Sequence, residues 1–289
     1  MKEHSMMLLT LALFAAIPGQ DPPKAEIGWK LKKGDKFRCE AGLTQSGTMG
    51  DVVFKSILFF NLGLEIGDTG KDGLVEAKAT YERIRFTLSS HNDKDRILDS
   101  DREEDRSIDP DKRVVLHLKG RTISLMFGSK GLSRVSGLGD AFREAYKSIG
   151  QTDNKVSAKS EQLAIALEQV LKINFPGAPD SAVSAGEGWP ESLSFERMSL
   201  RGATIKDLAK VKSLEKGRAI VDHKLTIELA TERRAGIEEV TGEGTTLWDL
   251  ERGLPVSHEI VIKVRGKEID QKRFEEHRFT LKLEPREKK

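Results

Sequence analysis

The sequence predicts a mainly β (α+β) protein, built as a curved antiparallel sheet or open half-barrel with a two-helix insertion. Apolar and polar residues alternate through most of the chain, as they do in strands that bury one face. Near residues 138–172 the apolar spacing changes to three and four residues, which indicates two amphipathic helices. We therefore expect one β-rich domain over residues 29–283 that carries this insertion.

The N-terminus has the pattern of an export signal. Residues 6–17 form a run of about a dozen mostly apolar residues, which suits a secretory signal and is shorter than the roughly 20 residues that span a bilayer. We expect a signal peptide at 1–19, a leader at 20–28 and a charged tail at 284–289. The alternative is a buried N-terminal helix or strand. No cysteine follows the apolar run, which disfavours a lipid anchor.

The first half of the chain predicts strands separated by glycine turns. Residues 52–66 are apolar on both parities, which is typical of a strand covered on both faces for part of its length. The inward parity changes between Tyr81 and Ile84, which indicates a bulge. Residues 89–113 are almost wholly polar and predict a long loop. The strands are expected at 37–43, 52–66, 74–88, 114–118, 121–127 and 131–136.

Two helices are expected to separate these strands from those of the second half. The first is predicted at 140–149, and the second at 161–172 with Ser160 as its N-cap. Strict alternation then resumes, with glycines at the hairpin turns. The strands are expected at 190–200, 204–214, 217–230, 240–250, 254–265 and 268–283.

The charge and cysteine content exclude two classes of protein. The chain has 48 basic and 46 acidic residues, a formal net charge of +2, without a long block of one sign. Nucleic-acid binding normally requires a clustered basic face, so no nucleic-acid partner is expected. The single cysteine, Cys39, rules out an intramolecular disulfide. It is in phase with apolar neighbours, and we expect it in the core.

The sequence contains no recognisable catalytic motif. The spacings of phosphate-binding loops, of the dinucleotide fingerprint and of the Gly-x-Ser-x-Gly elbow are all absent. Trp29, Trp189 and Trp248 could stack on a sugar, but their places at strand starts and within strands favour core packing. We therefore expect no cofactor and assign no catalytic residue.

The histidines give no zinc-binding pattern. His223 and His258 alternate with polar residues and share a phase with apolar ones. A histidine on such a face is usually a hydrogen-bonded core residue. The alternative is that the two meet across neighbouring strands, where they could bind a metal.

Acidic residues spaced by two in the polar stretch raise the question of calcium. Hard cations prefer several carboxylate oxygens. Two arginines interrupt the series, and a solvated loop is favoured over a calcium site. The acidic residues are Asp99, Asp101, Glu103 and Asp105.

Several short segments carry a resemblance to a known family. They are Trp29–Phe37 (WKLKKGDKF), Ile97–Asp101 (ILDSD), 120–138, 175–189 with its FPGAP and EGW elements, and Leu247–Val256 (LWDLERGLPV). Together they resemble an uncharacterised family of exported bacterial proteins, a domain of unknown function, over most of residues 27–283. That family is similar in outline to the curved half-barrels of periplasmic lipoprotein carriers. The resemblance implies a β-rich fold and offers no functional residue to carry over.

These observations favour an exported, non-enzymatic binding or structural module of the cell envelope. A curved sheet that encloses an apolar groove could hold a lipid or a hydrophobic peptide. The alternative is a hydrolase of envelope polysaccharide that uses paired carboxylates. The expected groove lining is Phe54, Leu58, Phe60, Leu163 and Leu167.

Overall fold

The computed structural model describes seven stretches of the chain. The expected signal peptide at 1–19 lies outside them, as do residues 20–22 of the expected leader and residues 287–289 of the expected tail. The described residues are 23–90, 93–102, 110–152, 156–194, 203–229, 236–268 and 271–286.

Fourteen strands are present in the described residues. Two of them, β1 (Lys24–Ala25) and β8 (Val183–Ser184), form a small separate sheet. The other twelve are β2 (Lys36–Met49), β3 (Val52–Thr69), β4 (Val75–Ser90), β5 (Asp93–Asp99), β6 (Thr122–Gly128), β7 (Gly131–Ser136), β9 (Gly188–Ser194), β10 (Thr204–Glu215), β11 (Arg218–Glu228), β12 (Ile237–Asp249), β13 (Leu254–Glu268) and β14 (Gln271–Pro285).

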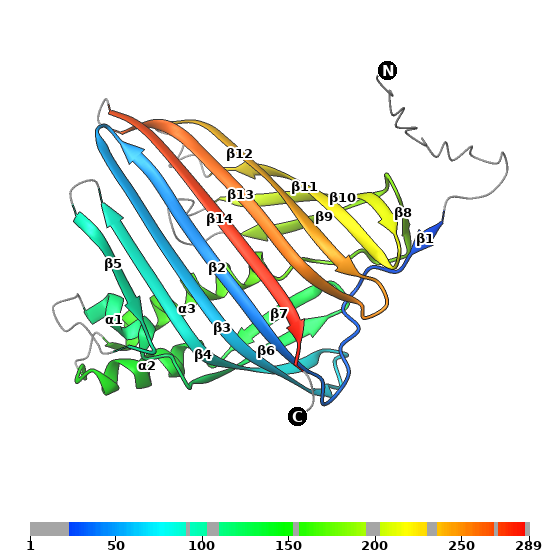
Figure 1. Cartoon of the computed structure of the whole chain (residues 1–289), viewed down its shortest axis with the longest axis horizontal. Helices are drawn as coiled ribbons and strands as arrows, with labels where there is room; N and C mark the ends of the chain where they lie inside the picture. The colour runs from blue at the N-terminus through cyan, green and yellow to red at the C-terminus, as the bar shows by residue number, and fades with distance from the viewer. Residues whose placement is uncertain are drawn as a thin grey trace, which may run out of the picture.

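These twelve strands form one antiparallel sheet. Its order is β7-β6-β4-β3-β2-β14-β13-β12-β11-β10-β9, and β5 also pairs with β4. The first long strand, β2, lies beside the last, β14, in the middle of the sheet (Figure 1). The sheet curves but does not close on itself, since β7 and β9 remain as edges. The prediction of an open, curved antiparallel sheet is confirmed.

Three helices lie against one face of this sheet (Figure 1): α1 (Pro110–Leu116), α2 (Leu138–Ser148) and α3 (Val156–Asn174). α3 contacts β2, β13 and β14 and packs on α2. The main core lies between the helices and the sheet, where the inward side chains of β2, β3 and β4 meet Phe142, Leu167 and Leu171. The helical insertion is therefore where the sequence predicted it.

Several local predictions are confirmed by packing and register. Cys39 is fully buried in the core. The bulge is at Glu82, because Tyr81 pairs with Leu62 whereas Arg83 pairs with the adjacent Asn61. The three tryptophans pack in the interior, as expected. The ring of Trp29 contacts Phe127, Phe175 and Trp248, and its Nε1 donates to the carbonyl of Pro176 at 3.0 Å.

The region after β4 was predicted wrongly. Residues 89–113 were expected to be a loop, but β5 and α1 lie within or at the end of this stretch. β5 offers one deeply buried apolar side chain, Leu98, too few for a visible pattern. A strand was predicted where α1 lies, because the apolar residues Val114, Leu116 and Leu118 recur every two residues. Val114 and Leu118 also have the four-residue spacing of a helix.

Two further expectations fail at the level of single residues. α3 begins at Val156, so Ser160 is a fully buried interior residue and not the N-cap. The outer face of β3 is open, with Phe59 40% exposed. On this open face the ring of Phe59 covers Gly42. A Cβ atom added at Gly42 would lie 2.6 Å from the ring.

Asp99 is the main polar anchor of β5. Its buried carboxylate accepts two hydrogen bonds from Arg83, at 2.6 and 3.0 Å, and contacts Arg85 at 3.4 Å. The hydrogen bonds from Arg83 hold the pKa of Asp99 well below its ordinary range. Asp101 pairs with Arg83 and Lys119, so both acidic residues are occupied by cationic side chains. Glu103 and Asp105 lie outside the described residues.

We expect Asp99→Asn to lower the free energy of unfolding by about 1–3 kcal/mol at neutral pH, because it removes a charged acceptor from two guanidinium groups. The pKa of Asp99 is lowered by folding, so this stabilisation is present above the ordinary carboxyl pKa and is lost as the pH falls below about 4. Urea unfolding at several pH values measures it. Asp101→Asn, at a more exposed site, should cost less than about 1 kcal/mol. Equal stability of D99N and the wild type would contradict this account.

Candidate functional site

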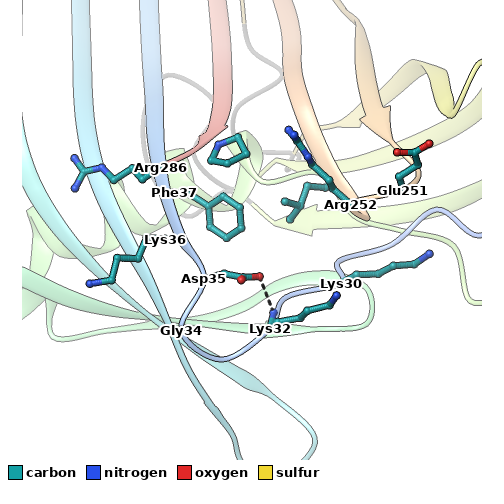
Figure 2. Close-up of a pocket in the computed structure, with 11 residues that line it drawn as sticks. Lys30, Lys32, Gly34, Asp35, Lys36, Phe37, Glu251, Arg252 and Arg286 are labelled. Atoms are coloured by element: carbon teal, nitrogen blue, oxygen red, sulfur yellow. Dashed lines mark hydrogen bonds between the residues drawn. The ribbon is translucent and has the colours of Figure 1, made fainter. Parts of the chain in front are cut away.

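A basic pocket opens at one end of the sheet. Its volume is about 1250 Å³, and three segments form it: the loop before β2, the turn between β12 and β13, and the end of β14 (Figure 2). We call it the basic pocket. Its lining residues are Lys30, Lys32, Gly34, Asp35, Lys36, Phe37, Glu251, Arg252, Leu254, Pro285 and Arg286.

Backbone hydrogen bonds fix the shape of this pocket. The amide of Lys30 donates to the carbonyl of Gly253 at 2.9 Å, which joins the first loop to the β12–β13 turn. The amide of Gly34 donates to Ile66 at 2.8 Å. Gly34 has a φ of 84° and Gly253 a φ of 62°, values that L-residues rarely adopt. A side chain at Gly253 would also stand 2.3 Å from the Lys30 side chain, so the close approach requires glycine.

The charges around the basic pocket are mainly positive. Five basic side chains line it against two acidic ones, Asp35 and Glu251. Four of the basic residues have an acidic neighbour outside the pocket: Lys30 with Glu26, Lys36 with Glu65, Arg252 with Asp249 and Arg286 with Glu82. Lys32 forms no ion pair with any residue that the structure describes. The pocket therefore offers an unneutralised cation among others that are only partly compensated.

The floor of the basic pocket is apolar. Phe37 and Leu254 are buried core residues that reach the pocket, and Pro285 adds a third apolar surface. In Figure 2 the ring of Phe37 lies between Lys36 and Arg286 on one side and Arg252 on the other. An apolar floor under a cationic rim suits a ligand that has both an apolar and an anionic part.

Four of the five residues expected to line a groove belong to the main core or pack against it. Phe60 and Leu167 are deeply buried in the main core, and Leu58 and Leu163 pack against that core with partial exposure. Phe54 is partly buried nearer the β2–β3 hairpin, with its ring over Gly47. None of the five borders the basic pocket. Their role in ligand binding stays a prediction.

A second polar group is buried beneath the end of α3. His223 Nδ1 is 2.6 Å from Asp207 Oδ2, and His223 Nε2 is 2.7 Å from Thr246 Oγ1. The same hydroxyl is 2.7 Å from His258 Nδ1, and His258 Nε2 is 3.0 Å from the carbonyl of Ile173. We call this series the buried chain. It crosses β10, β11, β12 and β13 and ends on the last turn of α3, and all four of its side chains are buried.

The buried chain contains the two histidines that the sequence pattern placed on inward faces. His223 and His258 are core residues with hydrogen bonds at every ring nitrogen, as expected. They also come close, with ring centroids 5.3 Å apart, on strands that flank β12. Because Asp207, Thr246 and Ile173 occupy all four nitrogens, no lone pair is left for a metal. Within the described residues, no group of three or more histidine, cysteine or carboxylate side chains could hold a metal ion.

Glu191 stands beside the buried chain. It is directly opposite Asp207 in the β9–β10 pairing and accepts hydrogen bonds from Trp189 Nε1 at 2.8 Å and from the amide of Gly177 at 3.2 Å. Burial, and then the charge of Asp207, raises the pKa of Glu191. The two carboxyl groups share a cavity of about 20 Å³, which has room for about one water molecule. A sugar ring does not fit in this cavity.

Sequence reasoning missed Asp207, Glu191 and Thr246, although a signal was present. Asp207 is in phase with the buried residues Ile205 and Ala209 on β10. Glu191 is in phase with buried Trp189 on β9, and Thr246 with buried Trp248 on β12. A polar residue on an inward face is the pattern that singled out the histidines. The basic pocket left no comparable signal, because its lysines and arginines come from three distant segments.

No family model matches the sequence. No curated protein matches it either. Among the described helices, none combines the length and apolar character needed to cross a membrane.

The pH dependence of stability should report on His258. Burial, together with the charge of His223, lowers the pKa of His258 from 6.5 to about 3. The unfolded chain therefore binds this proton more readily than the folded protein. Stability from this group is complete above about pH 6.5 and falls as the pH drops toward about 3, by about 1.4 kcal/mol per pH unit.

Urea unfolding between about pH 6 and pH 4 tests this prediction. His258→Gln, which cannot titrate, should show a slope of stability against pH smaller than that of the wild type by about 1.4 kcal/mol per unit. His117→Gln is the control, because His117 lies near the surface against Ser148. Identical slopes for H258Q and the wild type would refute the assignment.

Proposed function

We propose that the protein is an exported, non-enzymatic binding module of the cell envelope, and that the basic pocket holds an anionic amphiphile. The observation that carries the proposal is the pairing of five basic side chains with an apolar floor of Phe37, Leu254 and Pro285. The anionic group of the ligand would meet the rim, and its apolar part would cover the floor. Export rests on the apolar run at residues 6–17.

The chemistry of the pocket supports binding in preference to catalysis. Asp35 and Glu251 are its only acidic lining residues in the described part of the chain, and both stand among lysine and arginine side chains. Asp35 Oδ2 also accepts a hydrogen bond from the amide of Lys32 at 3.2 Å. A glycosidase needs one carboxyl group in an apolar position, where it keeps its proton. Neither residue has such a position.

The ligand is proposed to bind in the basic pocket and not in the groove that the sequence predicted. That groove was expected to be lined by Phe54, Leu58, Phe60, Leu163 and Leu167. The side chains of Leu167 and Phe60 are buried in the packed core, whereas the basic pocket is open to solvent. The apolar floor of the basic pocket has three residues, fewer than the predicted groove, and it suits a ligand with a single acyl chain. Its charged group supplies the specificity, because the rim offers several cations at one place.

Titration calorimetry with dodecyl phosphate tests the proposal. We expect it to bind more tightly than dodecyl maltoside, which has the same chain and no charge. Lys32→Ala and Arg252→Ala should each weaken binding of dodecyl phosphate by about 3- to 10-fold at low salt, and the loss should shrink at high salt through screening.

Lys33→Ala is the matched control for these variants. Lys33 is adjacent in sequence and equally basic, but it pairs with Asp68 and does not line the pocket. It should bind like the wild type. Equal affinity for dodecyl phosphate and dodecyl maltoside, or equal losses in K32A and K33A, would overturn the proposed site.

A further inference from the structure

The hydrogen bonds of the buried chain limit where its protons can lie. It contains four consecutive contacts: Asp207 to His223, His223 to Thr246, Thr246 to His258, and His258 to the carbonyl of Ile173. The four distances, between 2.6 and 3.0 Å, are those of hydrogen bonds. Each contact therefore needs one proton between its two heavy atoms.

Neutral imidazoles with an ionised Asp207 supply too few protons. Each neutral ring carries one N–H and the Thr246 hydroxyl carries one O–H, which gives three protons for four contacts. One contact would then place two lone pairs against each other inside the protein. A fourth proton removes this conflict.

The directions of the hydrogen bonds follow from the far end. The carbonyl of Ile173 only accepts, so His258 donates from Nε2 and accepts at Nδ1 from the Thr246 hydroxyl. The oxygen of Thr246 then accepts from His223 Nε2. The remaining contact, between His223 Nδ1 and Asp207, also needs a proton. It is held either by an imidazolium on an ionised Asp207 or by a neutral Asp207 on a neutral ring.

We propose that the buried chain stores one proton shared by Asp207 and His223, and that loss of this proton at alkaline pH reverses the hydrogen bonds along the chain and releases the last turn of α3. After the loss, ionised Asp207 needs the N–H of His223 at Nδ1. His223 Nε2 then accepts from Thr246, Thr246 accepts from His258 Nδ1, and His258 Nε2 has no proton left for Ile173. The loss of the proton at Asp207 on β10 therefore removes the hydrogen bond to Ile173 on α3.

The groups around the buried chain favour the stored proton. Glu191 on β9 faces Asp207 directly, and two facing carboxylates in one buried site repel each other unless a cation or a proton intervenes. On α3, Lys172 borders the same cavity and pairs with Glu168 at 2.8 Å. β12 contributes Thr246, which is uncharged. Asp207, His223 and His258 are the ionisable members on β10, β11 and β13.

The Ile173 carbonyl gives the switch a structural consequence. It belongs to the last turn of α3, where carbonyl groups lack a helical partner, and His258 supplies one. Pro176, three residues further, accepts the Trp29 Nε1 hydrogen bond, and Lys30 follows Trp29 in the basic pocket. The released turn therefore adjoins the segment that leads into that pocket.

NMR of isotope-labelled imidazole nitrogens in the full chain, together with the carboxyl carbon of Asp207, tests the proposal between about pH 5 and about pH 11. At neutral pH we expect one extra proton on the Asp207–His223 pair and the Nε2–H tautomer at His258. At higher pH this proton leaves, and His258 changes to the Nδ1–H tautomer in the same transition.

Three variants separate the switch from ordinary titration. Thr246→Ser keeps the hydroxyl and should keep the coupled change at His258. Thr246→Val has the same shape without a hydroxyl, and His258 should no longer respond when His223 titrates. Asp207→Asn can donate its own N–H to His223, so His258 should keep the Nε2–H tautomer through the whole range.

The stored proton is refuted if Asp207 is ionised and His223 carries one proton at neutral pH. The switch is refuted if the pair keeps its proton to the end of the range. It is also refuted if the pair titrates in the wild type while the His258 tautomer stays unchanged. Should T246V fail to fold, D207N decides the question, because a His258 tautomer that still changes in D207N contradicts the mechanism.

Discussion

The pairing of β2 with β14 is the constraint on which the architecture depends. The first long strand and the last run side by side from Phe37 and Pro285 to Met49 and Arg273, without a shift in register. This ladder joins the strands of the two halves into one sheet, and α3 lies across it. It also brings the start of β2 and the end of β14 together, and these are two of the three walls of the basic pocket.

Buried polarity sets a second constraint on the same fold. Buried polar groups are tolerated when hydrogen bonds link them, and the buried chain links such groups across four strands. Thr246 is central, because its hydroxyl is both donor and acceptor. The buried chain ends on the carbonyl of Ile173 in α3. A directional hydrogen bond therefore holds α3 to β13 in addition to the apolar contacts.

The parts of the fold that sequence reasoning predicted are those with many repeats of one pattern. β11 and β13 alternate over many residues, so their inward faces, including His223 and His258, could be assigned from sequence. β5 and α1 each offer few buried apolar residues, Leu98 in β5 and Val114 and Leu116 in α1, so neither displays a clear period. Their positions depend on contacts with β4, such as the Asp99 ion pairs, which join residues 14 and 16 positions apart.

The sequence by itself determined the fold class, the antiparallel alternation, the helical insertion and the buried state of Cys39, because these follow from local spacing of apolar residues. Only the tertiary structure decided which polar residues meet. Lys32 and Arg252 share a pocket across 220 positions of sequence, and the Ile173 carbonyl meets His258 across 85. Such meetings depend on strand order and register, which a period of two leaves open.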